Sequence, residues 1–118
     1  MEAAVANAVA EGSRGIVIVT GYFGDRLAQI FQRYGSTVRR IDVEWGRAVD
    51  PQRLRDELKR EGADVIGMVH AETSTGVRNP VKELAAVARE HGALTIVDMV
   101  TSLGGQEVDL AGWGVDIA

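Results

Sequence analysis

The stretch that decides the fold is LTIVDMVTSLGG at residues 94–105, an apolar run that ends at a carboxylate. Leu94–Val97 predicts a buried strand, because short apolar runs rich in β-branched residues are typical of parallel sheets. Asp98 closes that strand, and the polar residues and glycines after it predict a loop. A carboxylate at the end of a buried strand loses water and needs a cation or a hydrogen-bond donor. Asp98 is therefore the first candidate site residue.

Three similar strands precede this one. Apolar runs predict them at Ile16–Thr20, Val38–Val43 and Val65–Val69, and the second is the most polar, as expected at a sheet edge. Apolar residues at helical spacing predict four helices between and before the strands, at residues 1–9, 27–34, 51–61 and 80–91. This alternation predicts an α/β fold with a mostly parallel sheet and helices on both faces.

The helix boundaries carry their own signals. Asp50-Pro51 and Asn79-Pro80 each predict a helix start, with a capping side chain followed by proline. The first predicted helix begins at Met1 or Glu2 with no strand before it, and WGVDIA at residues 113–118 stops inside what resembles another strand. We therefore expect residues 1–118 to be part of one larger domain, truncated at both ends.

Composition excludes several classes of function. The net charge is −4 and the basic residues do not cluster, which argues against a nucleic-acid partner. The absence of cysteine excludes disulfides and thiolate metal sites, and no apolar run has the length of a membrane span. His70 and His91 have no partners at metal-ligand spacing, so we expect no metal site. We interpret His70 as a satisfied loop histidine and His91 as a helix-end residue. The expected location is cytoplasmic.

Three strand ends carry unusual segments, which we interpret as loops. They read GYFGDR at residues 21–26, HAETSTGV at 70–77, and the residues from Asp98 onward. Open α/β sheets bind ligands beyond the carboxyl ends of their strands, so these segments should share one edge. Phe23 would offer an aromatic face, and Thr73, Ser74 and Thr75 would offer hydroxyls. Alternatively, Phe23 is a core aromatic and the hydroxyls satisfy a turn.

The partner of Asp98 stays open at this point. A Mg²⁺ ion in a nucleotide-hydrolysing enzyme is disfavoured, because the phosphate loop is absent. A phospho-accepting aspartate would need an acidic pair after the first strand and a lysine near the C-terminus, and the only lysines are Lys59 and Lys82. Two interpretations remain: a protonated heteroaromatic nitrogen as the partner, or a carboxylate that caps the following turn.

Four strings occur in order: GYFGDR, HAETSTGV, VDMVTSLGG at residues 97–105, and WGVDIA. Together they resemble the class V aminotransferases of fold type I, nearest to the alanine–glyoxylate and serine–pyruvate aminotransferase group. The resemblance extends from Met1 to Ala118. It implies that the chain is part of the large domain that binds pyridoxal 5′-phosphate (PLP).

The resemblance also implies residue roles. Phe23 stands where the family has the aromatic residue that stacks on the pyridine ring, and Val100 where an apolar residue packs on the other face. Thr73 stands where a hydroxyl bonds the phenolic oxygen of PLP. Asp98 stands at the aspartate that pairs with the pyridine nitrogen, which keeps the ring an electron sink.

The catalytic group is expected outside this chain. In the family, the Schiff-base lysine follows a Ser-Gly-x-Gln-Lys string, and its position lies beyond Ala118; Lys59 and Lys82 lie on predicted helices and do not replace it. The resemblance implies a segment of an aminotransferase that moves an amino group from alanine or serine to glyoxylate or pyruvate. That segment is expected to be inactive alone, and the full-length protein to be a homodimer. Two alternatives remain, a fragment of the related aminoethylphosphonate aminotransferases and a non-catalytic module for binding or subunit contact.

Overall fold

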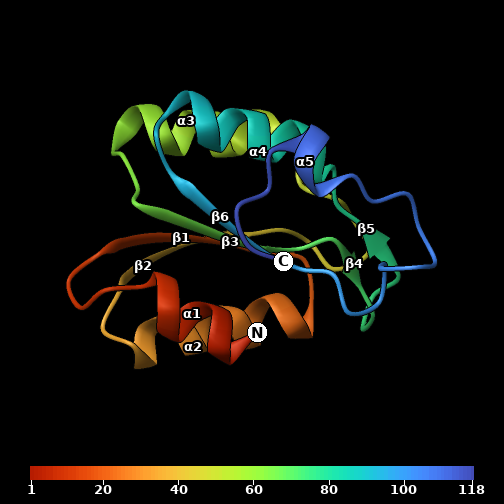
Figure 1. Cartoon of the computed structure of the whole chain (residues 1–118), viewed down its shortest axis with the longest axis horizontal. Helices are drawn as coiled ribbons and strands as arrows, with labels where there is room; N and C mark the ends of the chain where they lie inside the picture. The colour runs from red at the N-terminus through yellow and green to blue at the C-terminus, as the bar shows by residue number, and fades with distance from the viewer.

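The computed structural model describes residues 1–118, and a four-stranded parallel sheet forms its centre (Figure 1). The strand order is β2-β1-β3-β6, and all neighbouring pairs run parallel. The strands are β1 (Arg14–Val19), β2 (Thr37–Asp42), β3 (Val65–Val69) and β6 (Leu94–Asp98). All four predicted strands are confirmed close to their predicted bounds, and the polar strand β2 lies at an edge as expected.

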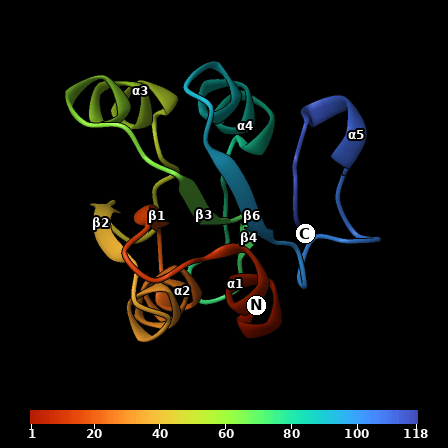
Figure 2. The ribbon, with the colours of Figure 1, turned by 60° about the vertical axis from the view of Figure 1, so that its left-hand side comes forward.

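Helices cover both faces of this sheet (Figure 2). α1 (Glu2–Ala8) and α2 (Tyr22–Arg33) lie on one face, and α3 (Pro51–Arg60) and α4 (Val81–Glu90) lie on the other. Three short elements were not predicted: the antiparallel hairpin of β4 (Ala71–Glu72) and β5 (Val77–Arg78), and α5 (Leu110–Trp113). The predicted α/β class with helices on both faces is confirmed.

The central strands are buried on both sides. In β1, Ile16 and Ile18 join the apolar core under α3 and α4, while Val17 and Val19 join the core under α1 and α2. All five residues of β3 are buried. This two-sided burial explains why the strands read as continuous apolar runs rather than as alternating ones.

Two predictions at helix starts were wrong. The segment at residues 21–26 is not a loop, because α2 already begins at Tyr22. Asn79 does not cap α4; its buried side chain accepts the Val49 N–H at 3.1 Å and donates to Thr20 Oγ1 and to the Val69 carbonyl, both at 2.9 Å. The Asn-Pro pair therefore marks a bridge between three segments, and α4 starts without a side-chain cap.

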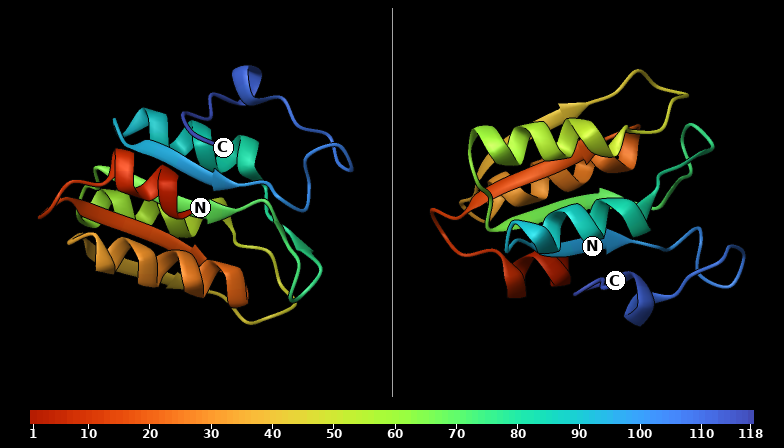
Figure 3. Two further views of the ribbon diagram at one scale, coloured as in Figure 1. Left: turned by 60° about the horizontal axis from the view of Figure 1, so that its bottom comes forward. Right: turned by 90° about the horizontal axis from the view of Figure 1, so that it is seen from above.

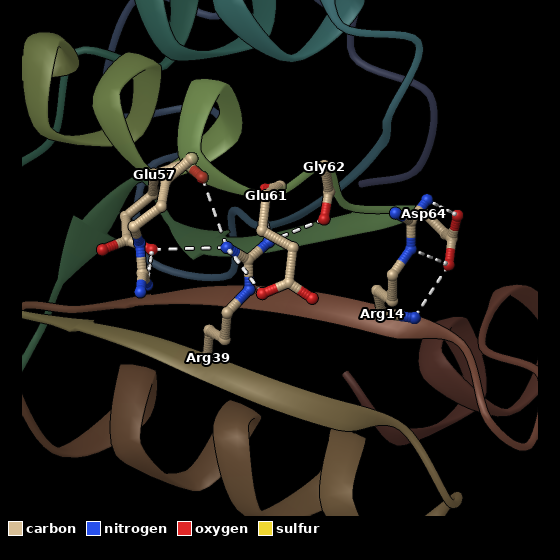
Figure 4. Close-up of polar contacts among 7 residues, drawn as sticks. Arg14, Arg39, Glu57, Glu61, Gly62 and Asp64 are labelled. Carbon is tan, nitrogen blue, oxygen red and sulfur yellow. Dashed lines mark hydrogen bonds and ion pairs between the residues drawn. The ribbon is translucent and has the colours of Figure 1, made fainter.

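The predicted start of α3 is confirmed. The Asp50 carboxylate accepts the Gln52 N–H at 2.9 Å. The far end of the helix is held from β2, since Arg39 donates to the carbonyls of Glu57, Glu61 and Gly62 (Figure 4). These bonds satisfy carbonyls that a helix end leaves without partners, and they fix the turn that leads into β3.

The C-terminal strand is confirmed only in part. Ile117 forms an isolated parallel bridge with Ile96, so the last residues lie beside β6 without forming a ladder. None of the helices has the length and apolar character that crossing a membrane requires.

The path of the chain opens a crevice at one edge of the sheet. From β1 the chain passes through α2 to β2 on one side, and then returns through α3 to β3 on the other side of β1. The segments after β1 and β3 consequently lead to helices on opposite faces, which is where open α/β sheets bind ligands. Figure 3 shows the strands ending on the same side, beside the β4–β5 hairpin.

Candidate functional site

A cavity of about 220 Å³ lies at the carboxyl ends of β3 and β6. Its lining includes all four residues singled out from the sequence: Phe23, Thr73, Asp98 and Val100. They come from the first turn of α2, the β4–β5 hairpin, the end of β6 and the loop after it. The structure therefore gathers on one cavity an aromatic ring, a hydroxyl, a carboxylate and a branched apolar side chain.

Asp98 uses only half of its carboxylate within the chain. Its Oδ1 atom accepts the N–H of Val100 at 3.0 Å, which is the turn-capping bond considered for it. Its Oδ2 atom makes no hydrogen bond in the chain. Because Asp98 is half-buried and lines the cavity, this oxygen is available to a donor there. Capping and ligand binding are thus compatible.

Phe23 is not a core aromatic. Its side chain is half-buried and lines the cavity, and it packs with the Tyr22 ring in a T-shaped arrangement, with centroids 5.2 Å apart and planes at 87°. The ring therefore stays open to a planar ligand while one neighbour restrains it.

The three hydroxyls after β3 separate into two groups. Thr73 lines the cavity, where its Oγ1 atom hydrogen-bonds to Oγ1 of Thr101 from the loop after β6. Ser74 and Thr75 bond to the backbone after β1: Ser74 Oγ accepts the Tyr22 N–H at 2.9 Å, and Thr75 donates to the Thr20 carbonyl at 3.1 Å, partners that lie 52 and 55 positions away. The interpretation that these hydroxyls satisfy the backbone of their own turn is therefore wrong, because they join the hairpin to the start of α2.

Three polar residues at or beside this site were not predicted from the sequence. Thr101 and Arg26 line the cavity, and Arg26 forms no ion pair or side-chain hydrogen bond in the chain. Arg26 follows Phe23 by one helical turn, a spacing that could have identified it. Glu72 is buried below the first turn of α2, and its role depends on residues 48 and 49 positions away. No local pattern signals such a contact.

His70 joins the two loops that carry the site. It is 3% exposed, and its Nδ1 atom hydrogen-bonds to Ser102 Oγ at 2.9 Å, so the prediction of a satisfied loop histidine is confirmed. Burial of the imidazole, and then the charge of Arg78, lower the pKa of His70 below its ordinary value. His91 hydrogen-bonds to the Val87 carbonyl at the end of α4, as predicted.

A larger cavity of about 460 Å³ adjoins the site and shares Met1, Asp98 and Val100 with it. Apart from Asp98 its lining is apolar, with residues such as Leu27, Ile96 and Leu103. Since orientation of a small ligand requires a few placed polar groups, the smaller cavity is the better candidate for recognition.

Comparison with known proteins gives a consistent result over nearly the whole chain. The model of a family described as aminotransferase class-V matches residues 2–118. The crystal structure of an alanine–glyoxylate aminotransferase from Nostoc sp. superimposes on this chain with a TM-score of 0.95 at 46% sequence identity. The superposition covers 98% of this chain and 31% of the Nostoc chain.

Two curated relatives align over a similar range. The (S)-ureidoglycine–glyoxylate transaminase of Bacillus subtilis is 36% identical, over 100% of this chain and 28% of its own length. The 2-aminoethylphosphonate–pyruvate transaminase of Syntrophobacter fumaroxidans is 37% identical, over 98% of this chain and 32% of its own length. The chain thus spans about a third of the length of the relatives that it matches.

Proposed function

The chain belongs to the class V aminotransferase family, and from that membership we propose that it is a segment of a PLP-dependent enzyme. The reaction moves an amino group from alanine or serine to glyoxylate or pyruvate. The names of the similar Nostoc and B. subtilis proteins support glyoxylate as an acceptor. The longer protein expected to contain this segment is called the full-length enzyme below.

The cavity shared by Phe23, Thr73, Asp98 and Val100 is the observation that carries this proposal. Its groups fit the cofactor of the family. A carboxylate with one free oxygen suits a ring nitrogen that bears a proton, and a hydroxyl suits a phenolic oxygen. An aromatic ring and a branched side chain suit the faces of a heterocycle. When bound, PLP supplies an electron sink for the substrate carbanion.

Each residue then has a definite task. Asp98 would hold the proton on the ring nitrogen of bound PLP, since an adjacent negative charge favours the charged form of its partner. Phe23 and Val100 would orient the ring. Thr73 would donate to the phenolic oxygen, and Thr101 would fix the direction of the Thr73 hydroxyl through the hydrogen bond between the two threonines.

Proton transfer at the substrate carbon needs a lysine that this segment does not place at the cavity. Lys59 lies exposed on α3, and Lys82 lines a different cavity beside His70. We therefore propose that the segment is inactive alone and that the full-length enzyme supplies the lysine. A cytoplasmic location and a homodimer stay predictions for that enzyme.

Substitution of Asp98 by Asn tests the proposal. The amide keeps the size of the side chain and removes its charge, so the charge-assisted bond to the ring nitrogen is lost. We expect the dissociation constant for PLP, titrated into the full-length apoenzyme, to rise at least about tenfold. Asp56→Asn, on the exposed face of α3, is the matched control. Equal affinities of the Asp98→Asn variant and the wild type would contradict the assignment.

One specific observation favours a second substrate class. The S. fumaroxidans relative, named for 2-aminoethylphosphonate and pyruvate, is as similar to this chain as the glyoxylate enzyme of B. subtilis. Steady-state assays of the full-length enzyme with alanine, serine and 2-aminoethylphosphonate as donors separate the two. Turnover of 2-aminoethylphosphonate with no turnover of alanine or serine would establish the second class in place of the first.

A further inference from the structure

Glu72 is a fully buried carboxylate that the proposed chemistry does not use. Its side chain is 1% exposed, yet both carboxylate oxygens have partners. Oε1 accepts the Phe23 N–H at 3.1 Å and the Ser74 hydroxyl at 2.7 Å, and Oε2 accepts the Gly24 N–H at 3.0 Å. Burying a carboxylate costs free energy unless its oxygens accept hydrogen bonds. Glu72 and its three donors are therefore expected to stay together in the folded chain.

These bonds replace a cap that α2 cannot provide itself. Gly21 stands at the N-cap position and has no side chain to accept the first N–H groups of the helix. Ser74 accepts the N–H of Tyr22, and Glu72 accepts the next two. A negative charge there is also favoured by the helix dipole. The start of α2 is therefore held by the hairpin.

The space around Gly21 agrees with this role. A Cβ atom at position 21 would lie 2.5 Å from both Glu72 Cγ and Ser74 Oγ, closer than atoms can pack. Glycine is thus required because the capping side chain enters where a side chain at position 21 would lie.

Glu72 connects two walls of the cofactor cavity. Its carboxylate binds the backbone of Phe23, whose ring lines the cavity, and its chain neighbour Thr73 lines the same cavity. The backbone carbonyl of Glu72 also accepts the Gly76 N–H at 2.8 Å, which stiffens the hairpin. From this juxtaposition we infer that Glu72 is a positioning residue, which fixes the Phe23 ring for stacking and its distance from the Thr73 hydroxyl. This inference rests on the proposed function.

Glu72→Gln in the full-length enzyme tests the inference. The amide oxygen can accept from one of the two helix N–H groups, but the amide NH₂ then faces the other N–H, donor against donor. The dissociation constant for PLP is expected to rise about tenfold. The circular dichroism of bound PLP, relative to its absorbance, should fall because the ring is held less firmly. Glu44→Gln removes only an exposed pair with Arg47 and is the control.

A double-mutant cycle distinguishes positioning from general destabilisation. If Glu72 acts through the ring, Phe23→Ala should remove most of its effect, and Glu72→Gln with Phe23→Ala should bind PLP about as weakly as Phe23→Ala alone. Fully additive losses would overturn the inference. If Glu72→Gln does not fold, Ser74→Ala serves in the same cycle, since it removes one bond to Glu72 and the bond to Tyr22.

Titration of the wild-type full-length enzyme with PLP distinguishes a failure of the proposed function from a failure of the inference about Glu72. A full-length enzyme that binds no PLP would overturn the proposed function and this inference with it. A wild type that binds PLP, together with a folded Glu72→Gln variant of unchanged affinity and dichroism, would overturn the inference alone.

Discussion

Asp98 divides its carboxylate between the chain and the cavity. The bond from Val100 N–H to Oδ1 places the apolar side chain of Val100, 88% exposed, where it lines the cavity. The same carboxylate leaves Oδ2 free for a ligand. At the scale of single residues, Asp98 and Val100 therefore depend on each other. The carboxylate of Asp98, which would bind the ring nitrogen, also positions Val100, which would pack on the ring.

Gly21→Ala is predicted to weaken the site without touching any residue that lines it. The added methyl group would collide with Glu72 Cγ and Ser74 Oγ, so the cap on α2 must shift. We expect weaker PLP binding by the full-length enzyme, in the direction expected for Glu72→Gln. Gly46→Ala is the control. It adds the same methyl group where the positive φ of Gly46 strains the backbone, but no neighbouring atom lies in the way. A Gly21→Ala enzyme with wild-type affinity for PLP would contradict the prediction.

Sequence reasoning reached the residues whose signals are local. Asp98 closes an apolar run, and Phe23 and Thr73 stand in strings that resemble a known family. The contacts of Glu72 and Asn79 were not predicted, because their partners lie far along the chain and no nearby sequence pattern indicates the contact. Asn79 even carries the local signature of a helix cap, which a tertiary bridge overrides.

At the scale of elements, the loops after β3 and β6 act as one unit. The hydrogen bond between His70 and Ser102 joins them in the buried interior, and the bond between Thr73 and Thr101 joins them at the wall of the cavity. The backbone adds a third connection, from the His70 N–H to the Asp98 carbonyl at 2.9 Å. Movement of either loop must therefore disturb both sides of the site.

This link is predicted to be sensitive to acid. Because the pKa of His70 is lowered in the folded chain, the unfolded chain takes up the proton first as the pH falls below 6.5. The stabilisation that neutral His70 contributes is full above 6.5 and is lost as the pH falls through the folded pKa. Urea unfolding of the full-length enzyme should show this loss, and His70→Asn should reduce it. Parallel pH profiles for the two proteins would contradict the prediction.

The main elements were predictable because each has a complete local pattern. β3 is apolar throughout since both faces are covered, and α3 has a cap, a proline and a spaced apolar face. The β4–β5 hairpin and α5 are too short for such a pattern, and contacts elsewhere in the fold hold them. The ring contact between His70 and Trp113 of α5, with centroids 5.5 Å apart, is one such contact.

At the scale of the whole molecule, topology places the site. The chain adds β2 on one side of β1 and then β3 and β6 on the other side. The segments after β1 and β3 therefore separate at this point, and β6 brings Asp98 to the cavity between them. The order of strands could not be derived from the apolar pattern alone, since many orders bury the same residues. The resemblance of four ordered strings to one family indicated the domain and its cofactor, and the order of the strands came from the structure alone.

The most direct test is a ¹⁵N nuclear magnetic resonance spectrum of the full-length enzyme loaded with PLP labelled at the pyridine nitrogen. We expect a protonated, hydrogen-bonded nitrogen in the wild type, because Asp98 stabilises that proton. In the Asp98→Asn variant, the nitrogen signal should shift to the unprotonated position. The same nitrogen signal in both proteins would contradict the central claim that Asp98 and its neighbours form a wall of the PLP site.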